Sequence, residues 1–166
     1  MEFISKDLLN YCENHTTAEA EVLKELNRET FAKVMSPRML SGHLQGSFLS
    51  LISTLLQPST ILEIGTYTGY SAICLAKGLK QGGKLITIDV NDELKSMVEQ
   101  YLAIANVLNS CEVLTGDAEK IIPTLKNNFD LVFIDANKEA YSRYYDLVRS
   151  EEHTSELQSR VDISYA

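Results

Sequence analysis

Four acidic residues stand at or near the ends of short apolar runs in this sequence, and a lysine follows the last of them. They are Glu63, Asp89, Asp117 and Asp135, with Lys138 three positions after Asp135. A carboxylate can accept hydrogen bonds from a ribose diol or an amine, and hard divalent cations prefer such oxygen ligands. A lysine beside a metal ion can have its pKa lowered toward that of a useful base. The set therefore indicates a small-molecule site, provided that the fold gathers these residues.

The apolar runs beside these acids are predicted β-strands, at 60–64, 84–89, 111–116 and 130–135. Each is followed by a segment of helical composition, and the runs are too apolar for burial on one side only. This alternation predicts an α/β fold with a mostly parallel sheet and helices on both faces. The carboxyl ends of the strands then lie along one edge, where ligands bind in such folds.

Two helices are predicted ahead of the sheet. Thr16 and Glu19 form a candidate capping box, and apolar residues at helical spacing follow it until the break at Pro37. A second apolar pattern covers 44–56 and ends before Pro58.

The first predicted strand leads into "GTYTG" (65–69), whose glycines are four positions apart. Glycine lets the backbone bend sharply and lets a ligand approach where a Cβ atom would collide, and the next helix offers free N–H groups. A carboxylate at Glu63 would repel a pyrophosphate but would favour a ligand that carries a cation or an ammonium group. The alternative is a tight strand-to-helix turn in which Glu63 forms a structural salt bridge.

Asp89 follows Gly69 by twenty residues, a spacing at which an acid in this class of fold hydrogen-bonds a ribose diol. A lone aspartate at a strand end is often a helix N-cap instead, although Asn91 or Asp92 could supply that cap here. The spacing therefore supports nucleoside binding.

The two later acids each have a functional and a structural interpretation. Asp117 and Ala118 would border an adenine ring, with Asp117 accepting from the exocyclic amine, but Gly-Asp is also an ordinary turn pair. Asp135 could bind a divalent cation beside Lys138, but the pair could equally be a helix N-cap and a solvated lysine.

The composition suits one globular domain that binds a small molecule. The 166 residues are 45% hydrophobic, and 15 Lys and Arg against 23 Asp and Glu give a formal charge of −8. This charge argues against nucleic acid or an anionic membrane as the main partner. The cysteines, Cys12, Cys74 and Cys111, are widely spaced and odd in number, which fits buried thiols in a reducing compartment. With no apparent membrane span or signal peptide, we expect a cytoplasmic protein.

Together these features resemble the metal-dependent class I S-adenosylmethionine O-methyltransferases, the group of caffeoyl-CoA and catechol O-methyltransferases and their bacterial relatives. The resemblance covers about 31–148 and depends on motifs in the family's order and spacing: "RMLSGHLQGSFLSLI", "ILEIGTYTGYSA", "LITIDVND", "GDAEKIIP" and "FDLVFIDANKEAYSRYYDLV". It implies a Rossmann-like class I methyltransferase fold and methyl transfer from S-adenosylmethionine to a catechol-like or acyl-CoA-linked phenolic hydroxyl. It also implies Mg²⁺ or a similar divalent cation, and a homodimer for full-length members.

The resemblance further implies roles for particular residues. The cofactor-binding residues would be Ser41, Gly42, Glu63, Gly65, Ser71, Asp89, Asp117, Ala118 and Asp135. Glu63 and Gly65 would line the methionine portion, and Ser71 would hold its carboxylate end. Asp135 matches the first metal-ligand aspartate, and Lys138 matches the lysine proposed as general base. His43, in the loop that includes Ser41 and Gly42, is interpreted as structural, with substrate contact as the alternative.

The chain departs from this family after Val148. The family continues with a fifth strand, whose Asp-Asn pair completes the metal site, and then a hairpin, whereas 149–166 reads "RSEEHTSELQSRVDISYA". The first part of this tail matches the translation of a common sequencing adapter. We therefore expect a truncated methyltransferase domain at 1–148, incomplete at its C-terminus, and a non-native or disordered tail at 149–166. Such a fragment would expose the edge of the fourth strand and have impaired turnover.

Two other functions stay open on the sequence. An NAD-binding Rossmann oxidoreductase domain is disfavoured because Gly65 and Gly69 lack the third glycine of that fingerprint. A nucleoside-binding or dimerisation fragment without catalysis is the better description of this chain if the tail at 149–166 is an artefact.

Overall fold

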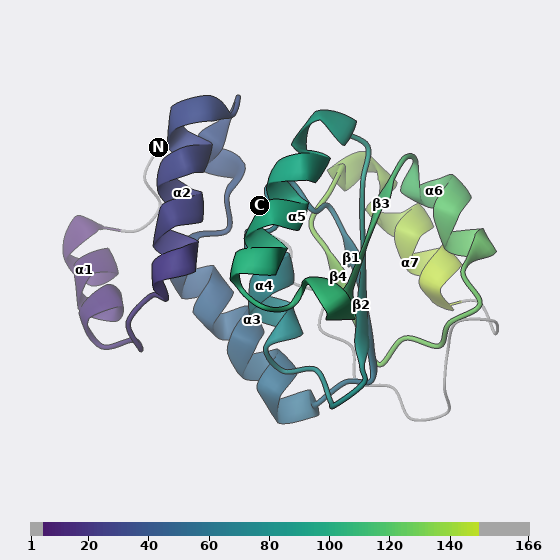
Figure 1. Cartoon of the computed structure of the whole chain (residues 1–166), viewed down its shortest axis with the longest axis horizontal. Coiled ribbons are helices and arrows are strands. Elements are labelled where there is room, and N and C mark those ends of the chain that lie inside the picture. The colour runs from purple at the N-terminus through teal and green to yellow at the C-terminus, as the bar shows by residue number, and fades with distance from the viewer. Residues whose placement is uncertain (1–4, 150–166) are drawn as a thin grey trace.

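The computed structural model describes residues 5–149 (Figure 1). Within this range, parallel strands form one sheet in the order β3-β2-β1-β4. The strands are β1 Thr60–Ile64, β2 Lys84–Asp89, β3 Cys111–Thr115 and β4 Leu131–Ile134. The predicted parallel sheet is confirmed, and β3 and β4 are slightly shorter than the runs from which they were predicted.

Helices cover both faces of this sheet, as predicted (Figure 1). One layer contains α2 Glu21–Lys33, α3 Gly42–Leu56, α4 Tyr70–Ala76 and α5 Lys95–Ile104, with α1 Lys6–Asn14 on its outer side. The opposite layer contains α6 Ala118–Ile121 and α7 Tyr141–Arg149. Short 3₁₀ turns are η1 Pro37–Met39, η2 Asp92–Leu94, η3 Leu108–Ser110, η4 Ile122–Thr124 and η5 Lys138–Ala140.

Each strand contributes to two cores, because successive side chains point to opposite faces of a sheet. On β1, Ile61 packs in the cluster beneath α2 to α5, whereas Leu62 and Ile64 pack in the cluster with α6 and α7. All three are at most 1% exposed. Burial on both faces explains why the strand segments are almost continuously apolar.

The start of α2 differs from the prediction. The capping box expected at Thr16 and Glu19 is wrong, because α2 begins after Ala20 and the Thr16 hydroxyl instead donates to the Cys12 carbonyl. The sequence pattern also did not predict α1, whose N-cap is Ser5. The second predicted helix, at 44–56, is confirmed as α3.

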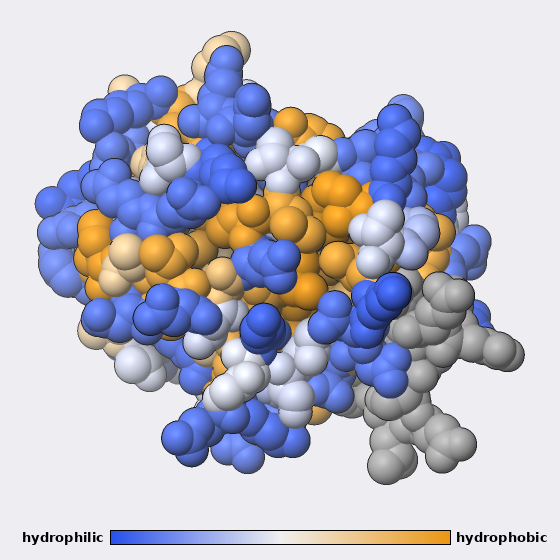
Figure 2. Space-filling view, turned by 45° about the vertical axis from the view of Figure 1, so that its right-hand side comes forward, coloured by the Kyte–Doolittle hydropathy of each residue, from blue (hydrophilic) through white to orange (hydrophobic). Residues whose placement is uncertain are grey.

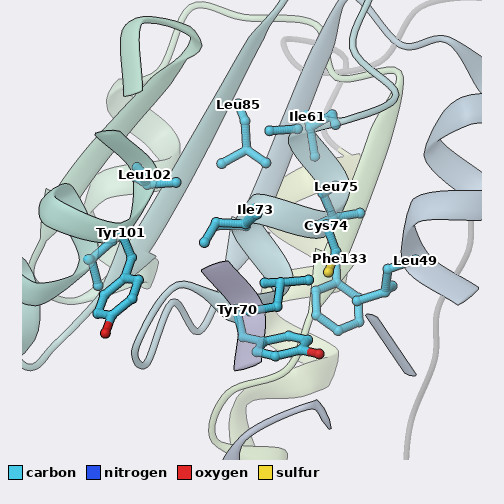
Figure 3. Packing of buried hydrophobic residues seen from close by; sticks show 14 of the residues in the cluster. Leu49, Ile61, Tyr70, Ile73, Cys74, Leu75, Leu85, Tyr101, Leu102 and Phe133 are labelled. Carbon is cyan, nitrogen blue, oxygen red and sulfur yellow. The ribbon is translucent and has the colours of Figure 1, made fainter. Parts of the chain in front are cut away.

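Two tyrosines connect the larger core to the N-terminal helical layer (Figure 3). The Tyr70 hydroxyl donates to Glu19 Oε1, and the Tyr101 hydroxyl donates to Glu29 Oε2. Burial, together with the acceptor carboxylate, raises the pKa of Tyr101 to about 12, and the same causes raise the pKa of Tyr70. Both hydroxyls therefore remain donors at neutral pH and hold α4 and α5 against the segment that contains α2.

At the far side of the molecule from α7, α3 packs closely on α4 and the turn that follows it, because the contact uses small residues. A Cβ atom at Gly46 would lie 2.6 Å from Tyr70 Cε1, and one at Gly78 would lie 2.1 Å from the carbonyl carbon of Ser53. The Ser53 hydroxyl adds a 2.6 Å hydrogen bond to the Leu75 carbonyl oxygen. The contact therefore leaves no room for a larger side chain at these glycines.

The strand β4 lies at one edge of the described sheet, with β1 as its neighbour. The expected tail falls outside the described residues from position 150 onward.

Among residues 5–149, no helix combines the length and apolar character needed to cross a bilayer, and Cys12, Cys74 and Cys111 are free thiols. Figure 2 shows apolar side chains gathered across the middle of one face, with hydrophilic side chains around them.

We predict that Gly78→Ala lowers the free energy of unfolding by about 2 kcal/mol, because the added methyl group collides with the Ser53 backbone. Gly82→Ala is the control. It has no described heavy atom within 4 Å of the new Cβ, and it costs only the strain of a left-handed backbone at φ 78°, about 1 kcal/mol. Urea unfolding of both variants measures the difference, and a Gly78→Ala variant no less stable than Gly82→Ala would contradict the packing described.

Candidate active site

A cleft of about 470 Å³ opens at the carboxyl edge of the sheet. The strand order reverses between β1 and β4, and the cleft lies at this point, as expected for α/β sheets. The segment before α3, the ends of β1, β2 and β4, and helices α6 and α7 all contribute to it. Its lining residues are Met35, Ser36, Met39, Ile64, Gly65, Tyr67, Ile88, Asp89, Val90, Asn91, Leu94, Gly116, Ala118, Asp135, Ala136, Asn137 and Tyr144.

Gly65 has two structural reasons to be glycine. Its φ of +103° is strained for any other residue, and a Cβ atom there would lie 2.1 Å from the Asp135 carbonyl oxygen. Backbone hydrogen bonds fix this close approach, because Gly65 N–H donates to Ile88 O and Asp135 N–H donates to Ile64 O. The glycine therefore lets the ends of β1 and β4 meet at the cleft.

The rest of the glycine turn is held from three directions. The Thr66 hydroxyl is hydrogen-bonded to Thr87 of β2, and the buried Thr68 hydroxyl accepts from Thr30 of α2. The hydroxyl of Tyr67 lies 3.1 Å from the Met35 carbonyl oxygen, and also within reach of the next carbonyl. These hydrogen bonds hold the turn in place as one wall of the cleft. Its partners, on β2, on α2 and in the segment at Met35, are distant in the sequence and meet through the fold.

Asp89 is positioned by backbone donors on both sides. Its Oδ2 accepts from Tyr67 N–H at 2.7 Å, and its Oδ1 accepts from Asn91 N–H at 3.0 Å. The cap of the following turn is supplied by Asn91, which accepts from Glu93 N–H. Asp89 therefore has a fixed carboxylate that lines the cleft and retains lone pairs for a ligand.

Glu63 is completely buried in β1 and is not among the described residues that line the cleft. In the sheet it lies between Thr87 of β2 and Phe133 of β4. Its Oε2 accepts from the Thr87 hydroxyl, but its Oε1 has no hydrogen-bond partner among residues 5–149. The salt bridge considered from the sequence is thus absent from the described part of the chain.

Burial raises the pKa of Glu63 to about 7. Ser71 and Thr87 lower this pKa, whereas the charges of Asp135 and Asp89 raise it further. Those two aspartates line the cleft, as do the next two residues of the chain, Ile64 and Gly65, so Glu63 lies close to the cleft's wall. A buried carboxylate with one oxygen unpaired is costly, so a cationic group of a ligand would be favoured beside it.

Asp135 and Lys138 follow β4 and lie near each other. Partial burial raises the pKa of Asp135, and hydrogen bonding to Gln45 and the charge of Lys138 lower it. Only Asp135 of the two lines the cleft. Among residues 5–149 no group of three His, Cys, Asp or Glu side chains could hold a metal ion, so the described residues do not fit a complete metal centre.

Several predicted residues lie elsewhere. Asp117 accepts from Glu119 N–H as the N-cap of α6, a structural role different from the turn pair considered for it. Ser41 and Gly42 stand at the start of α3 and are not among the described lining residues, whereas Met35, Ser36 and Met39 from the preceding segment are. Ser71 is buried at the start of α4.

His43 also lies away from this cleft. It lines two smaller hollows beside α3, and its Nδ1 is 3.5 Å from the Ser47 hydroxyl. The structural interpretation of His43 suits this location.

Sequence reasoning missed several residues that line the cleft. Val90 and Asn91 directly follow β2, and Ala136 and Asn137 follow Asp135 at the end of β4. Their position just beyond a parallel strand was the available signal. Tyr144, from α7, carried none, because only the packing of that helix brings it to the cleft.

Comparison with solved structures defines the class of protein. The SAH-bound methyltransferase PaMTH1 of Podospora anserina matches with a TM-score of 0.87 at 26% identity, over 94% of this chain and 67% of that one. TomG of Streptomyces achromogenes, an O-methyltransferase in complex with SAM, matches with a TM-score of 0.85 at 31% identity, over 94% of this chain and 70% of that one. The fold is that of a Rossmann-like methyltransferase.

Sequence comparison then gives the family. An O-methyltransferase family profile matches residues 13–150, so the chain belongs to that family. A catechol O-methyltransferase of Niastella koreensis is 33% identical over 143 residues, which are 84% of this chain and 61% of the relative. Caffeoyl-CoA O-methyltransferase 1 of Arabidopsis thaliana is 33% identical over 141 residues, 79% of this chain and 54% of the relative. The chain thus spans less than two thirds of the length of these curated relatives.

We predict that Glu63→Gln stabilises the ligand-free protein in a pH-dependent way. The folded-state pKa of about 7 lies above the usual 4.5, so wild-type stability falls as the pH rises from about 4.5 through 7. Glutamine does not ionise, so the variant should gain roughly 2–3 kcal/mol over wild type at pH 8 relative to the same comparison at pH 5.

Urea unfolding at both pH values measures this gain. Glu112→Gln, at an exposed position on β3, is the matched control and should show no such change. Equal effects of Glu63→Gln at pH 5 and pH 8 would contradict the buried titration.

Proposed function

We propose that this chain is the cofactor-binding part of an S-adenosylmethionine-dependent O-methyltransferase that acts on a phenolic hydroxyl. One observation carries the proposal: Gly65, Asp89, Ala118 and Asp135, which the sequence assigned to the cofactor from four separate segments, line one cleft. Membership of the O-methyltransferase family and the SAM- and SAH-bound structural relatives support it.

The residues of the cleft suit the parts of this cofactor. The Asp89 carboxylate faces the cleft with free lone pairs for two ribose hydroxyls, and Ala118 leaves space beside it for a flat base. Glu63 and Ser71 would serve the amino-acid end, where the unpaired Glu63 Oε1 suits an ammonium group. When bound, S-adenosylmethionine supplies a methyl group activated by a sulfonium centre.

The acceptor side of the proposal rests on Asp135 and Lys138, whose charges lie near each other at the end of β4. A lysine in that place could take the proton of a phenolic hydroxyl, and the carboxylate would hold the lysine toward it. Catechol and caffeoyl-CoA methyltransferases among the relatives suggest catechol-like or acyl-CoA-linked phenols. The divalent cation belongs to the proposal for the full-length protein, because residues 5–149 contain no group of three His, Cys, Asp or Glu side chains that could hold it.

The domain limits, the location and the assembly of the protein are also proposals. We place the methyltransferase domain at 1–148, with 149–166 outside it, and the protein in the cytoplasm. The full-length protein would be a homodimer, as the family resemblance implies, and sedimentation velocity of that protein would measure it.

Cofactor titration tests the proposal. We expect isothermal calorimetry to detect binding of S-adenosylhomocysteine by the 166-residue chain and none of NADH, because the Glu63 carboxylate beneath the cleft disfavours a pyrophosphate. Binding of NADH without S-adenosylhomocysteine would instead support the oxidoreductase alternative.

We predict that Asp89→Asn weakens S-adenosylhomocysteine binding at least tenfold, because an amide replaces one acceptor oxygen of a charged, backbone-held carboxylate. Asp130→Asn is the matched control. Asp130 Oδ2 likewise accepts from two backbone N–H groups, of Ser59 and Thr60, but at the opposite edge of the sheet. The control should lose comparable stability in urea and keep its affinity for the ligand, and equal losses of affinity in both variants would contradict the assignment.

We also predict that the 166-residue chain shows no measurable turnover of catechol with S-adenosylmethionine and Mg²⁺, because a single carboxylate holds Mg²⁺ weakly. A radiolabelled methyl-transfer assay, with an equal concentration of a full-length relative as positive control, measures this. Brisk turnover would show that the site is complete.

A further inference from the structure

A row of buried polar side chains runs beneath the cleft from the glycine turn to β1. Thr66, Thr87 and Glu63 are each at most 2% exposed. Glu63 and Thr87 are direct neighbours in the sheet register, with Oε2 of the one and Oγ1 of the other 2.5 Å apart. Thr66 Oγ1 lies 2.5 Å from the same Thr87 hydroxyl.

Which group donates in each of these hydrogen bonds follows from the number of protons that each group carries. An ionised carboxylate has no proton to donate, so the Thr87 hydroxyl gives its single proton to Glu63. Thr87 can then only accept from Thr66, which must donate. When Glu63 is ionised, Thr66 therefore donates to Thr87 and Thr87 donates to Glu63, which links the glycine turn to the carboxylate through hydrogen bonds of one polarity.

This row engages only one oxygen of Glu63. The partnered oxygen is Oε2, and Oε1 is the buried side-chain atom that makes no hydrogen bond within residues 5–149, although the Ser71 hydroxyl lies near enough to lower the pKa of the carboxylate. An unpaired buried carboxylate oxygen is expensive unless a donor reaches it.

We propose that Thr87 is a positioning residue that, together with Thr66, holds Glu63 so that Oε1 is kept available to accept from the ammonium group of the cofactor. This inference rests on the proposed function and adds to it a residue that does not itself contact the ligand. Thr87 acts through Glu63, and Thr66 couples the carboxylate to the turn that forms the cleft wall.

The charged and polar groups around Glu63 determine how the contact between Glu63 and an ammonium group depends on pH. Asp89 and Asp135 act on it from the ends of β2 and β4, Ser71 from α4, and Cys74 and Cys111 are close enough to sense its charge. The two aspartates disfavour its ionised form, whereas Thr87 and Ser71 favour it. Affinity for an ammonium-bearing ligand should therefore rise with pH as Glu63 ionises, and loss of the Thr87 hydroxyl should move that rise to higher pH.

The test measures S-adenosylhomocysteine affinity by calorimetry between pH 5.5 and 8.5 for wild type, Thr87→Val and Thr87→Ser. Valine keeps the branched shape but removes the hydroxyl, and serine keeps the hydroxyl. We expect Thr87→Val to bind about tenfold more weakly at pH 7 and to move the midpoint of the rise upward by about one pH unit. Thr87→Ser should stay within about twofold of wild type and keep its midpoint.

Thr66→Val is a second variant, which keeps the proposal testable if Thr87→Val does not fold. Thr66→Val removes the donor to Thr87 and should shift the midpoint in the same direction by a smaller amount, with circular dichroism confirming the fold. An unchanged midpoint in both valine variants, or a loss of affinity equal at every pH, would overturn the positioning role. If the wild-type protein binds no S-adenosylhomocysteine, both the proposed function and this inference fail. If the wild-type protein binds it and Thr87→Val has the same pH profile, this inference alone fails.

Discussion

The parallel pairing of β1 with both β2 and β4 is the constraint on which the rest of the structure depends. It places the ends of these strands side by side, so acids that are far apart in the sequence meet at one edge. It also places the reversal of strand order between β1 and β4, where Gly65 passes so close to the Asp135 backbone that no side chain fits. The cleft is therefore a product of the sheet, and the helices complete its walls.

Glu63 shows what this arrangement costs and how the chain reduces the cost. A carboxylate in a central strand loses its hydration, and two further acids nearby oppose its ionisation. The hydroxyl of Thr87 offsets part of that penalty, and it is available only because register pairs it with Glu63. Glu63 Oε1 has no partner among residues 5–149, so a hydrogen-bond donor that reached it would lower the free energy of the protein. The cofactor contact proposed for Glu63 would account for an acid in an apolar strand.

Much of the fold followed from the sequence, because its signals are local. Apolar runs bounded by glycines and acids predicted β1 to β4 within a residue, and Pro58 marked the end of α3. The convergence of Gly65, Asp89, Ala118 and Asp135 followed from the rule that parallel strands end together. The start of α2 was wrong because Thr16 and Glu19 bond to other elements, and Tyr144 was missed because helix packing, rather than any local pattern, brings it to the cleft. The cap role of Asp117 could not be distinguished from a ligand contact until the direction of its carboxylate was known.

The hydroxyl of Tyr67 carries one proton but lies 3.1 Å and 3.3 Å from the carbonyl oxygens of Met35 and Ser36. A single proton can make a good hydrogen bond to one of these two oxygens at a time. The hydroxyl can therefore switch between the Met35 and Ser36 carbonyls while the hydrogen bond to this segment is kept. Met35 is 89% exposed, which adds little packing to hold that segment in place. The segment at Met35 and Ser36 is therefore attached to the glycine turn through one hydroxyl proton, whereas the ends of β1, β2 and β4 are fixed by several backbone and carboxylate hydrogen bonds.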